Sequence, residues 1–478
     1  MKMLVLGLDC ADPSLLFGDL ELPNCRALMA RGSYGRLESV NPPITVPAWA
    51  CFATGRDPGS LGVYGFRNRA DRSYSNLTMV TSASIRQPTI WDVVAGQGGT
   101  VNIVGVPPSF PVRRSWISGL GSSDSVNTPS QDLRPKTKDL LARGVSVGCF
   151  LTPDTREHEF VSPSSLRPQI ERLVGTYPVD VSNFRTHDKA RLLREIYSVS
   201  RRQWDVVRWL VRSTEWDYFH FVEIGLDRLQ HGFWKFHDAE HVLHEPGNCY
   251  KNVIRDYYRY LDEQIGTVLE MLDEETAILV LSDHGAQPLD GGFCVNEWLL
   301  REGLLALDEY PREVTPFNNL SVDWSRTTAW SEGGYYARLF MNVRGREPQG
   351  TIERSDYERV RDDLVRRLET TVDGEGRLLG TRAYRPEEIY CDVRGVAPDL
   401  LVHFGDLRWR SIGSVGHGSI HCRENDTGPD DCNHAPFGGF VLSAPGVQQG
   451  WVEGAKLVEL GPTLLEAAGY DVAVGSRQ

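Results

Sequence analysis

Short, largely apolar runs bounded by polar or turn-forming residues constrain the fold of this chain more than any other feature. They lie at residues 3–8, 100–106, 218–223, 277–281 and 440–443. Between them, residues 189–213 and 252–272 carry apolar side chains three and four positions apart, as in helices that bury one face. Near-continuous apolar runs are typical of buried parallel strands. Strands alternating with helices therefore predict an α/β fold with a mostly parallel central sheet and helices on both faces.

Residues 107–186 interrupt this alternation. They open on Pro107-Pro108, pass through a Gly- and Ser-rich stretch at 119–123, and carry further prolines and serines. We predict an inserted cap or lid here, which leaves residues 1–106 and 187–478 as the catalytic core. A second irregular region spans about 344–427 and contains a predicted helix near 357–368.

Charge and composition restrict the classes of partner. The 478 residues include 64 acidic and 51 basic side chains, for a net charge of -13, which argues against nucleic acid or an anionic membrane as a partner. A small anionic substrate remains possible because bound metals reverse the local field. The nine cysteines are scattered without a C-x-x-C pair, and no apolar stretch approaches the ~18 residues of a membrane span. We therefore expect a cytoplasmic protein that does not associate with membranes.

The residues that follow the predicted strands are the candidates for chemistry, because reactive groups collect at the carboxyl ends of such strands. Asp9 follows the first run, and its carboxylate is either a metal ligand or the N-cap of the next helix. Thr45 lies between Pro43 and Pro47, where a helix is predicted to begin. Its hydroxyl is either a nucleophile that a metal activates or a capping group.

Three further segments carry aspartate or histidine. Asp227 and His231 are four residues apart, so a helical turn places both on one face, as ligands of one metal or as part of a solvated surface. Asp283 and His284 end a fully apolar strand, where buried charge is costly unless paired, and this favours metal ligation. The candidates for a last ligand are three histidines near the end of the chain: His417, His421 and His434.

In chain order these residues read Asp, Thr, Asp-x3-His, Asp-His and His. This ordered set resembles the alkaline phosphatase superfamily, specifically its type I phosphodiesterase/nucleotide pyrophosphatase branch, and is most similar to the group described as predicted phosphohydrolases or phosphomutases. The resemblance touches most of the chain and is weakest over residues 107–186. It also includes Gly35-Arg36-Leu37, Asn296-Glu297-Trp298-Leu299, Ala397-Pro398-Asp399-Leu400 and Gly461-Pro462-Thr463-Leu464.

The resemblance implies two divalent metal ions at one site. One ion is held by Asp9, Asp283, His284 and the oxygen of Thr45. The other is held by Asp227, His231 and His434, the histidine that directly precedes the last strand. Nitrogen and oxygen ligands favour zinc, with manganese as an alternative. The resemblance further implies that Thr45 attacks phosphorus while the Val46 N–H binds the phosphoryl oxygens.

Two departures from the family pattern bear on the substrate. The asparagine that contacts phosphate in nucleotide pyrophosphatases corresponds to Phe66 here, with Asn68 or Arg67 as a substitute nearby, and this puts nucleotide specificity in doubt. Thr45 and Trp49 occupy the Cys and Arg places of the sulfatase signature, which argues against a sulfatase.

The predicted activity is hydrolysis of a small-molecule phosphate monoester or diester through a phosphothreonine at Thr45. One alternative is a phosphomutase resembling cofactor-independent phosphoglycerate mutase, for which residues 107–186 supply a lid that excludes water. An alternative of another class is a non-catalytic metal-binding protein on the same fold.

Overall fold

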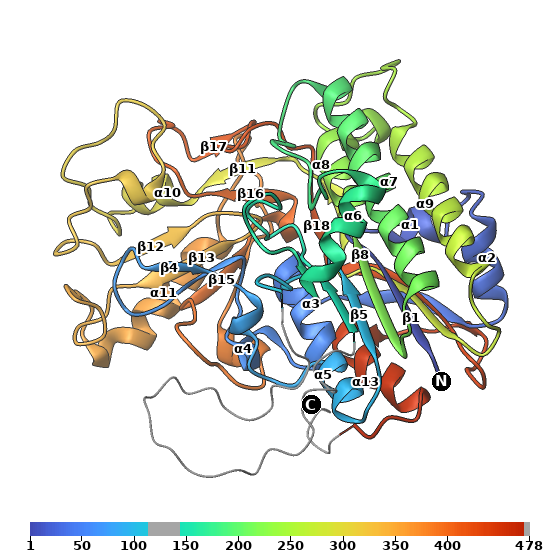
Figure 1. Ribbon diagram of the computed structural model, residues 1–478. Helices are drawn as coiled ribbons and strands as arrows, with labels where there is room; N and C mark the ends of the chain where they lie inside the picture. Colours follow the sequence, from blue (N-terminus) through green and yellow to red (C-terminus); the bar gives the residue numbers. More distant parts are fainter. Residues whose placement is uncertain (113–143, 473–478) are drawn as a thin grey trace, which may run out of the picture.

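The structure, a computed structural model, describes residues 1–112 and 144–472 (Figure 1). In its central sheet, β1 (Met3–Leu8) pairs in parallel with β8 (Tyr218–Glu223) on one side and β9 (Ala277–Leu281) on the other. Beyond β8 lie β5 (Val101–Val104) and β6 (Gly144–Val147), both parallel to it. The predicted mostly parallel sheet is therefore confirmed, and its first four predicted strands correspond to β1, β5, β8 and β9.

The last predicted strand runs in the opposite direction. β19 (Phe437–Ser443) pairs antiparallel with both β9 and β2 (Ser33–Glu38). The prediction of a parallel strand at 440–443 is wrong, because an apolar run that is buried on both faces does not record its own direction. Since β19 is antiparallel, the residues that precede it lie at the edge of the sheet where β1, β8 and β9 end.

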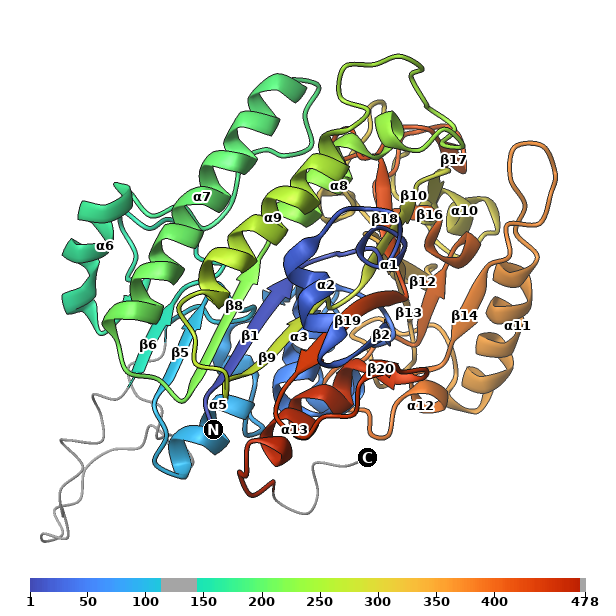
Figure 2. The ribbon, with the colours of Figure 1, turned by 90° about the vertical axis from the view of Figure 1, so that its right-hand side faces the viewer.

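Helices cover both faces of the sheet, as predicted (Figures 1 and 2). Along β1, Leu4 and Leu6 pack into one apolar core, and Met3 and Val5 pack into the other. The first core is covered by α1 (Pro13–Leu16), α2 (Pro23–Ala30), α7 (Lys189–Ser213), α8 (Gly225–His237) and α9 (Val253–Leu269). The second is covered by α3 (Thr45–Thr54), α5 (Ile90–Gly96) and α13 (Leu457–Ala467). The predicted helices at 189–213 and 252–272 are α7 and α9.

The chain between β9 and β19 forms a smaller second lobe (Figure 1). Its largest sheet is antiparallel, with the order β12, β13, β15, β14. These strands are β12 (Ala329–Glu332), β13 (Ala337–Met341), β14 (Arg382–Tyr384) and β15 (Leu400–His403), with α10 (Val295–Arg301) and α11 (Tyr357–Glu369) packed against them. The predicted helix near 357–368 is α11, but the region predicted as irregular also contains β14 and β15.

Short elements complete the fold. The antiparallel pair of β10 (Gly285–Pro288) and β18 (Cys432–Ala435) joins the end of β9 to the start of β19. The others are α4 (Pro58–Leu61), β3 (Arg67–Arg69), β4 (Leu77–Met79), β11 (Gly291–Cys294), α12 (Pro386–Ile389), β16 (Trp409–Ile412), β17 (His421–Cys422), β20 (Gly450–Trp451) and β21 (Ala455–Lys456). Among the residues that the structure describes, no helix combines the length and the apolar character that crossing a bilayer requires.

The predicted cap at 107–186 is only partly within the described residues, because 113–143 lie outside them. Its second half contributes β6 and β7 (Val161–Ser162) to the central sheet, followed by α6 (Arg167–Val174). Its last residues approach the ends of the central strands, where Asp180 pairs with Arg228 of α8. That residues 107–186 act as a cap stays a prediction.

Candidate active site

Asp9 leaves the end of β1 and is held by a tryptophan. The indole Nε1 of Trp49 donates to Asp9 Oδ2 at 2.8 Å. This contact needs Gly7, because a Cβ at that position would overlap the Trp49 ring. The next residue, Cys10, has φ 67°, a left-handed conformation that is strained for a non-glycine residue. The N-cap of the following helix is Asp12, so Asp9 is free of the capping role.

Thr45 is the first residue of α3, and its hydroxyl faces the site. Its Oγ lies 3.4 Å from Asp9 Oδ1 and 3.2 Å from His284 Nε2. The N-cap of α3 is Ile44, so Thr45 does not cap the helix. Val46, the second residue of α3, has no intrahelical acceptor for its N–H because it lies in the first turn.

Asp283 and His284 follow β9 and complete a first group with Asp9. His284 Nε2 lies 3.3 Å from Asp283 Oδ2 and 3.6 Å from Asp9 Oδ1. Burial raises the pKa of both carboxyls well above the ordinary value, and the neighbouring carboxylates raise it further. Burial lowers the pKa of His284 to about 4. Uncompensated negative charge is therefore gathered here, as in a site built for a cation.

Asp227, His231 and His434 form a second group beside the first. Asp227 and His231 lie one turn apart on α8, with Asp227 Oδ1 at 3.3 Å from His231 Nε2. His434, on β18, places Nε2 at 3.6 Å from the same oxygen and at 3.3 Å from His231 Nε2. Burial would raise the pKa of Asp227, but the charges of His231 and Arg228 hold it well below the ordinary value.

The three imidazoles present the same nitrogen to the site. Nδ1 of His284 bonds the carbonyl of Gly285 at 3.1 Å, and Nδ1 of His434 bonds the carbonyl of Pro43 at 2.8 Å. Nδ1 of His231 bonds Asp430 Oδ1 at 2.6 Å. Because a carbonyl or carboxylate oxygen only accepts, each Nδ1 carries a proton, and each Nε2 faces the site, where its lone pair can bind a metal when the ring is neutral. Metal-binding histidines are oriented in this way.

The two groups fit divalent metal ions. Asp227 Oδ1 and Asp283 Oδ2 are buried and have no hydrogen-bond partner among the described residues. Ligand atoms about 2.0–2.2 Å from a tetrahedral zinc ion are about 3.3–3.6 Å apart, which is the spacing found within each group. The two groups adjoin at His284, because a ring nitrogen of this residue also lies within 4.8 Å of ligand atoms of Asp227 and His434.

The other predicted residues lie elsewhere. His417 Nε2 contacts the Ser414 hydroxyl, and His421 Nε2 bonds the carbonyl of Val372. Asn68 accepts from the Tyr64 N–H and donates to the carbonyl of Gly65, so its amide is occupied within its own turn. Of the three candidate histidines, the described structure brings His434 alone to Asp227 and His231. The roles of His434 and Asn68 stay predictions.

Asp430 was not among the predicted ligands. In the sequence it belongs to the acidic loop 424–431, which is typical of a solvated turn and has a further cation site as the alternative. It is buried, and its Oδ2 binds Arg185 at 2.8 Å and Arg410 at 3.0 Å while Oδ1 holds His231. Burial would raise the pKa of Asp430, but the charges of His231 and the two arginines hold it well below the ordinary value. Its position four residues before His434 is the one sequence signal that could have indicated it.

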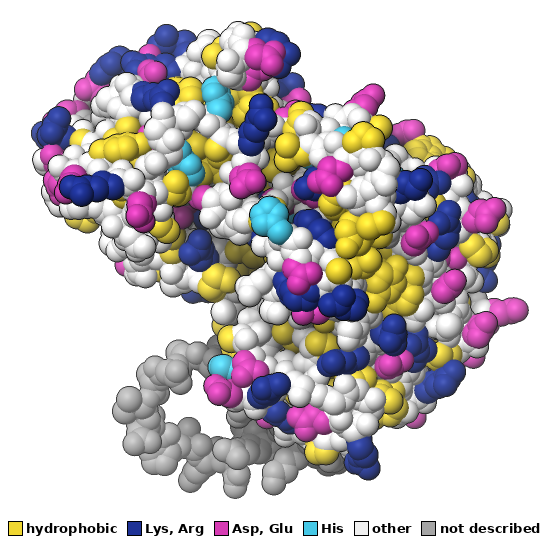
Figure 3. All heavy atoms as spheres, turned by 90° about the horizontal axis from the view of Figure 1, so that it is seen from above, with side chains coloured by type: hydrophobic (Ala, Val, Ile, Leu, Met, Phe, Trp, Pro, Cys, Tyr) yellow, Lys and Arg dark blue, Asp and Glu magenta, His cyan; other side chains and the backbone are white. Residues whose placement is uncertain are grey.

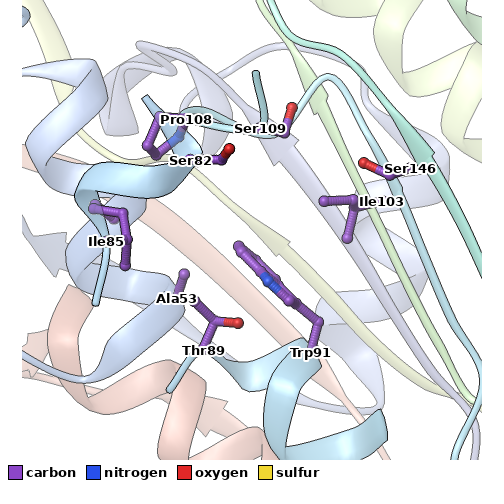
Figure 4. Close-up of a pocket in the computed structure, with 10 residues that line it drawn as sticks. Ala53, Ser82, Ile85, Thr89, Trp91, Ile103, Pro108, Ser109 and Ser146 are labelled. Carbon is purple, nitrogen blue, oxygen red and sulfur yellow. The ribbon is translucent and has the colours of Figure 1, made fainter. Parts of the chain in front are cut away.

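An apolar cavity beside α3 is too small for a substrate (Figure 4). It has a volume of about 10 Å³ and is lined by Trp91, Ile103, Ser109 and Ser146 among others. A cavity of this size holds about one water molecule. A larger cavity adjoins the two groups of Asp and His side chains.

A match to one family model over most of its length places the chain among the phosphoric ester hydrolases. More specifically, a model of the family described as type I phosphodiesterase / nucleotide pyrophosphatase matches residues 3–430, and the chain belongs to that family. No curated protein sequence matches the chain.

Solved structures of other proteins share its fold, and two of them are compared with the chain. Phosphonoacetate hydrolase from Sinorhizobium meliloti 1021, in complex with phosphonoacetate, has a TM-score of 0.59 at 15% identity. Murine ectonucleotide pyrophosphatase / phosphodiesterase 5 has a TM-score of 0.51 at 13% identity. Each comparison covers 98% of this chain and 96% of the other. At these identities the likeness supports the fold, and the substrate must be argued from the site.

Proposed function

We propose that the chain hydrolyses small phosphate esters through a covalent phosphothreonine at Thr45, with two divalent cations bound beside it. The observation that carries this proposal is the position of the Thr45 hydroxyl. It lies 3.4 Å from Asp9 Oδ1 and 3.2 Å from His284 Nε2, and it has no role as a helix cap.

In the first step, the Thr45 oxygen attacks phosphorus in line with the ester oxygen of the leaving group. The new Oγ–P bond forms as the bond from phosphorus to the leaving oxygen breaks. The Thr45 hydroxyl releases its proton to solvent, and the leaving oxygen takes one up from solvent. In the second step, water attacks the phosphothreonine, the Oγ–P bond breaks, and the Thr45 hydroxyl is restored. The products are the alcohol and the phosphate, or a phosphate monoester when the substrate is a diester.

The N-terminus of α3 supports both steps. The Val46 N–H belongs to the first turn and has no intrahelical partner. Together with the positive end of the helix dipole, this N–H would stabilise the negative charge that develops on the phosphoryl oxygens next to Thr45.

Two sets of side chains would hold the cations. The first set is Asp9, Asp283, His284 and the Thr45 oxygen, and the second is Asp227, His231 and His434. When bound, divalent cations of this kind supply Lewis acidity and lower the pKa of an oxygen nucleophile. The mixed imidazole and carboxylate donors favour zinc over manganese.

The test is turnover of a panel of phosphate monoesters, phosphodiesters and a sulfate ester by the full chain, stripped of metal and then supplied with zinc or manganese. We expect metal-dependent release of the alcohol from phosphate esters but not from the sulfate ester. Transfer of the phosphoryl group to a second hydroxyl of the substrate, without release, would instead identify a phosphomutase. Absence of any turnover with either metal would contradict the proposal.

A further inference from the structure

A cavity of about 280 Å³ lies between the two lobes and is lined by arginines from separate parts of the chain. None of the described residues that line it is an aspartate or glutamate. Viewed from above, the molecule is hollowed between its two lobes, with Lys and Arg as well as Asp, Glu and His side chains beside the hollow (Figure 3). The arginines that line the cavity are Arg67, Arg185, Arg228, Arg338 and Arg410.

The cavity opens directly beside the metal-binding groups. Ile44, which lines it, precedes Thr45 in the chain. Tyr335, another lining residue, stacks on His434 with ring centroids 4.0 Å apart. Arg228 Nη1 lies 2.5 Å from Asp227 Oδ2. A molecule whose phosphorus is at Thr45 would therefore extend into this cavity.

The positive charge of the cavity is only partly neutralised by the protein. Arg228 is paired with Asp180 and Asp227, but Arg185 and Arg410 share the single carboxylate of Asp430.

Arg67 and Arg338 have no ion-pair partner in the part of the chain that the structure describes. Arg338 is only 7% exposed and donates to the carbonyl oxygen of Arg67. A buried guanidinium without a counter-ion is costly, so the cavity is built to receive an anion.

We infer, on the basis of the proposed function, that this cavity binds a second anionic group on the leaving-group side of the substrate. The substrate class is then a small phosphate ester whose alcohol carries a carboxylate or a further phosphate. Arginine suits both groups, because its planar fork binds either one through two parallel hydrogen bonds. The volume is at the lower end of small-molecule sites, which favours a short carbon skeleton.

The test compares esters matched in length: propyl phosphate, 3-phosphonooxypropanoate, propane-1,3-diol bisphosphate and 3-aminopropyl phosphate. Each is supplied as the monoester and as its methyl diester to the metal-loaded full chain. We expect kcat/KM for one or both acidic esters to exceed that for the propyl ester by about tenfold to a hundredfold, the size of one charged hydrogen bond. The aminopropyl ester should be the poorest substrate.

Two variants test whether the cavity arginines cause the preference for acidic esters. In Arg338→Met, and separately in Arg67→Met, the ratio of kcat/KM between the preferred acidic ester and the propyl ester should fall about tenfold. Arg67 is exposed, so its variant remains informative if Arg338→Met does not fold. The control is Arg326→Met, whose side chain is 75% exposed away from the cavity, and the ratio should be unchanged.

The outcomes separate the two proposals. Equal turnover of acidic and neutral esters by the wild type, or a preference that survives both cavity variants, overturns the inference and leaves the proposed function intact. Failure to hydrolyse any of these esters overturns both. A preference for the carboxylate or for the bisphosphate identifies which anionic group the substrate carries.

Discussion

The carboxylate of Asp430 lies 2.6 Å from Nδ1 of His231, a residue 199 positions earlier in the chain. This contact fixes the imidazole with Nε2 directed at Asp227 and His434. Partners of this kind orient a metal ligand and raise its basicity, and their loss typically weakens metal binding by about 10–100-fold.

Asp430→Asn should therefore bind the second cation about 10–100-fold more weakly, while Thr45 and the first group remain in place. Competition with a chromophoric chelator measures the affinity. Because Asp430 also binds Arg185 and Arg410, the melting temperature of the metal-free variant is measured separately. Glu424→Gln, on the exposed part of the same loop, is the matched control. Wild-type affinity in Asp430→Asn would show that the contact does not serve a metal ligand.

Thr45→Ala should reduce turnover by about 10⁴-fold or more, as expected when a nucleophile is removed. Its metal content should stay close to that of the wild type, because six of the seven proposed ligands remain. Thr45→Ser keeps the hydroxyl and should retain measurable activity. Trapping with labelled substrate at low pH should give a phosphoprotein in the wild type and in Thr45→Ser only. Full activity of Thr45→Ala would exclude Thr45 as the nucleophile.

Gly7→Ala should disturb the site through Trp49. The added Cβ overlaps the Trp49 ring, so the indole must move away from Asp9. We expect a loss of stability of about 1–3 kcal/mol from overpacking, together with a lower kcat. Gly96→Ala is the control, since a Cβ there meets no atom within 4 Å. Wild-type kcat in Gly7→Ala would mean that Trp49 does not position Asp9.

His220 should make the protein sensitive to acid. It is buried among Trp49, Phe52 and Trp91, and burial lowers its pKa to about 3. The unfolded chain protonates this residue below about pH 6.5, whereas the folded protein does not. Stability is therefore lost as pH falls from about 6.5 towards 3, by about 2 kcal/mol at pH 5 for this one residue.

His220→Phe removes this titration and should flatten the dependence of the free energy of unfolding on pH between 7 and 5. Denaturant titrations at constant metal concentration measure the effect. His187→Gln, at an exposed position, should leave the dependence unchanged. An unaltered slope in His220→Phe would show that His220 is not the group responsible.

The sequence predicted the parts of the fold that depend on local pattern. Buried strands such as β1 and β9, and amphipathic helices such as α7, follow directly from the spacing of apolar residues. The direction of β19 does not, because strand direction depends on pairing partners and not on composition. The strands of the second lobe were also missed, since β13 and β14 each carry an arginine that interrupts the apolar pattern.

The site residues also divide into those that local sequence pattern predicts and those that it does not. Asp283 and His284 were predictable because charge at the end of an apolar strand requires a partner. Asp430 was not, because only the folded chain brings this loop residue against α8. The cavity arginines are spread from Arg67 to Arg410, and nothing in their local sequence indicates that they converge.

Anomalous diffraction from crystals of the full chain grown with zinc tests the central claim most directly. Two peaks about 3.5–4 Å apart are expected. One should be bonded to Asp9, Asp283 and His284, and the other to Asp227, His231 and His434, with the Thr45 hydroxyl facing the first. A single peak, or peaks bound elsewhere on the molecule, would contradict a two-metal site at Thr45.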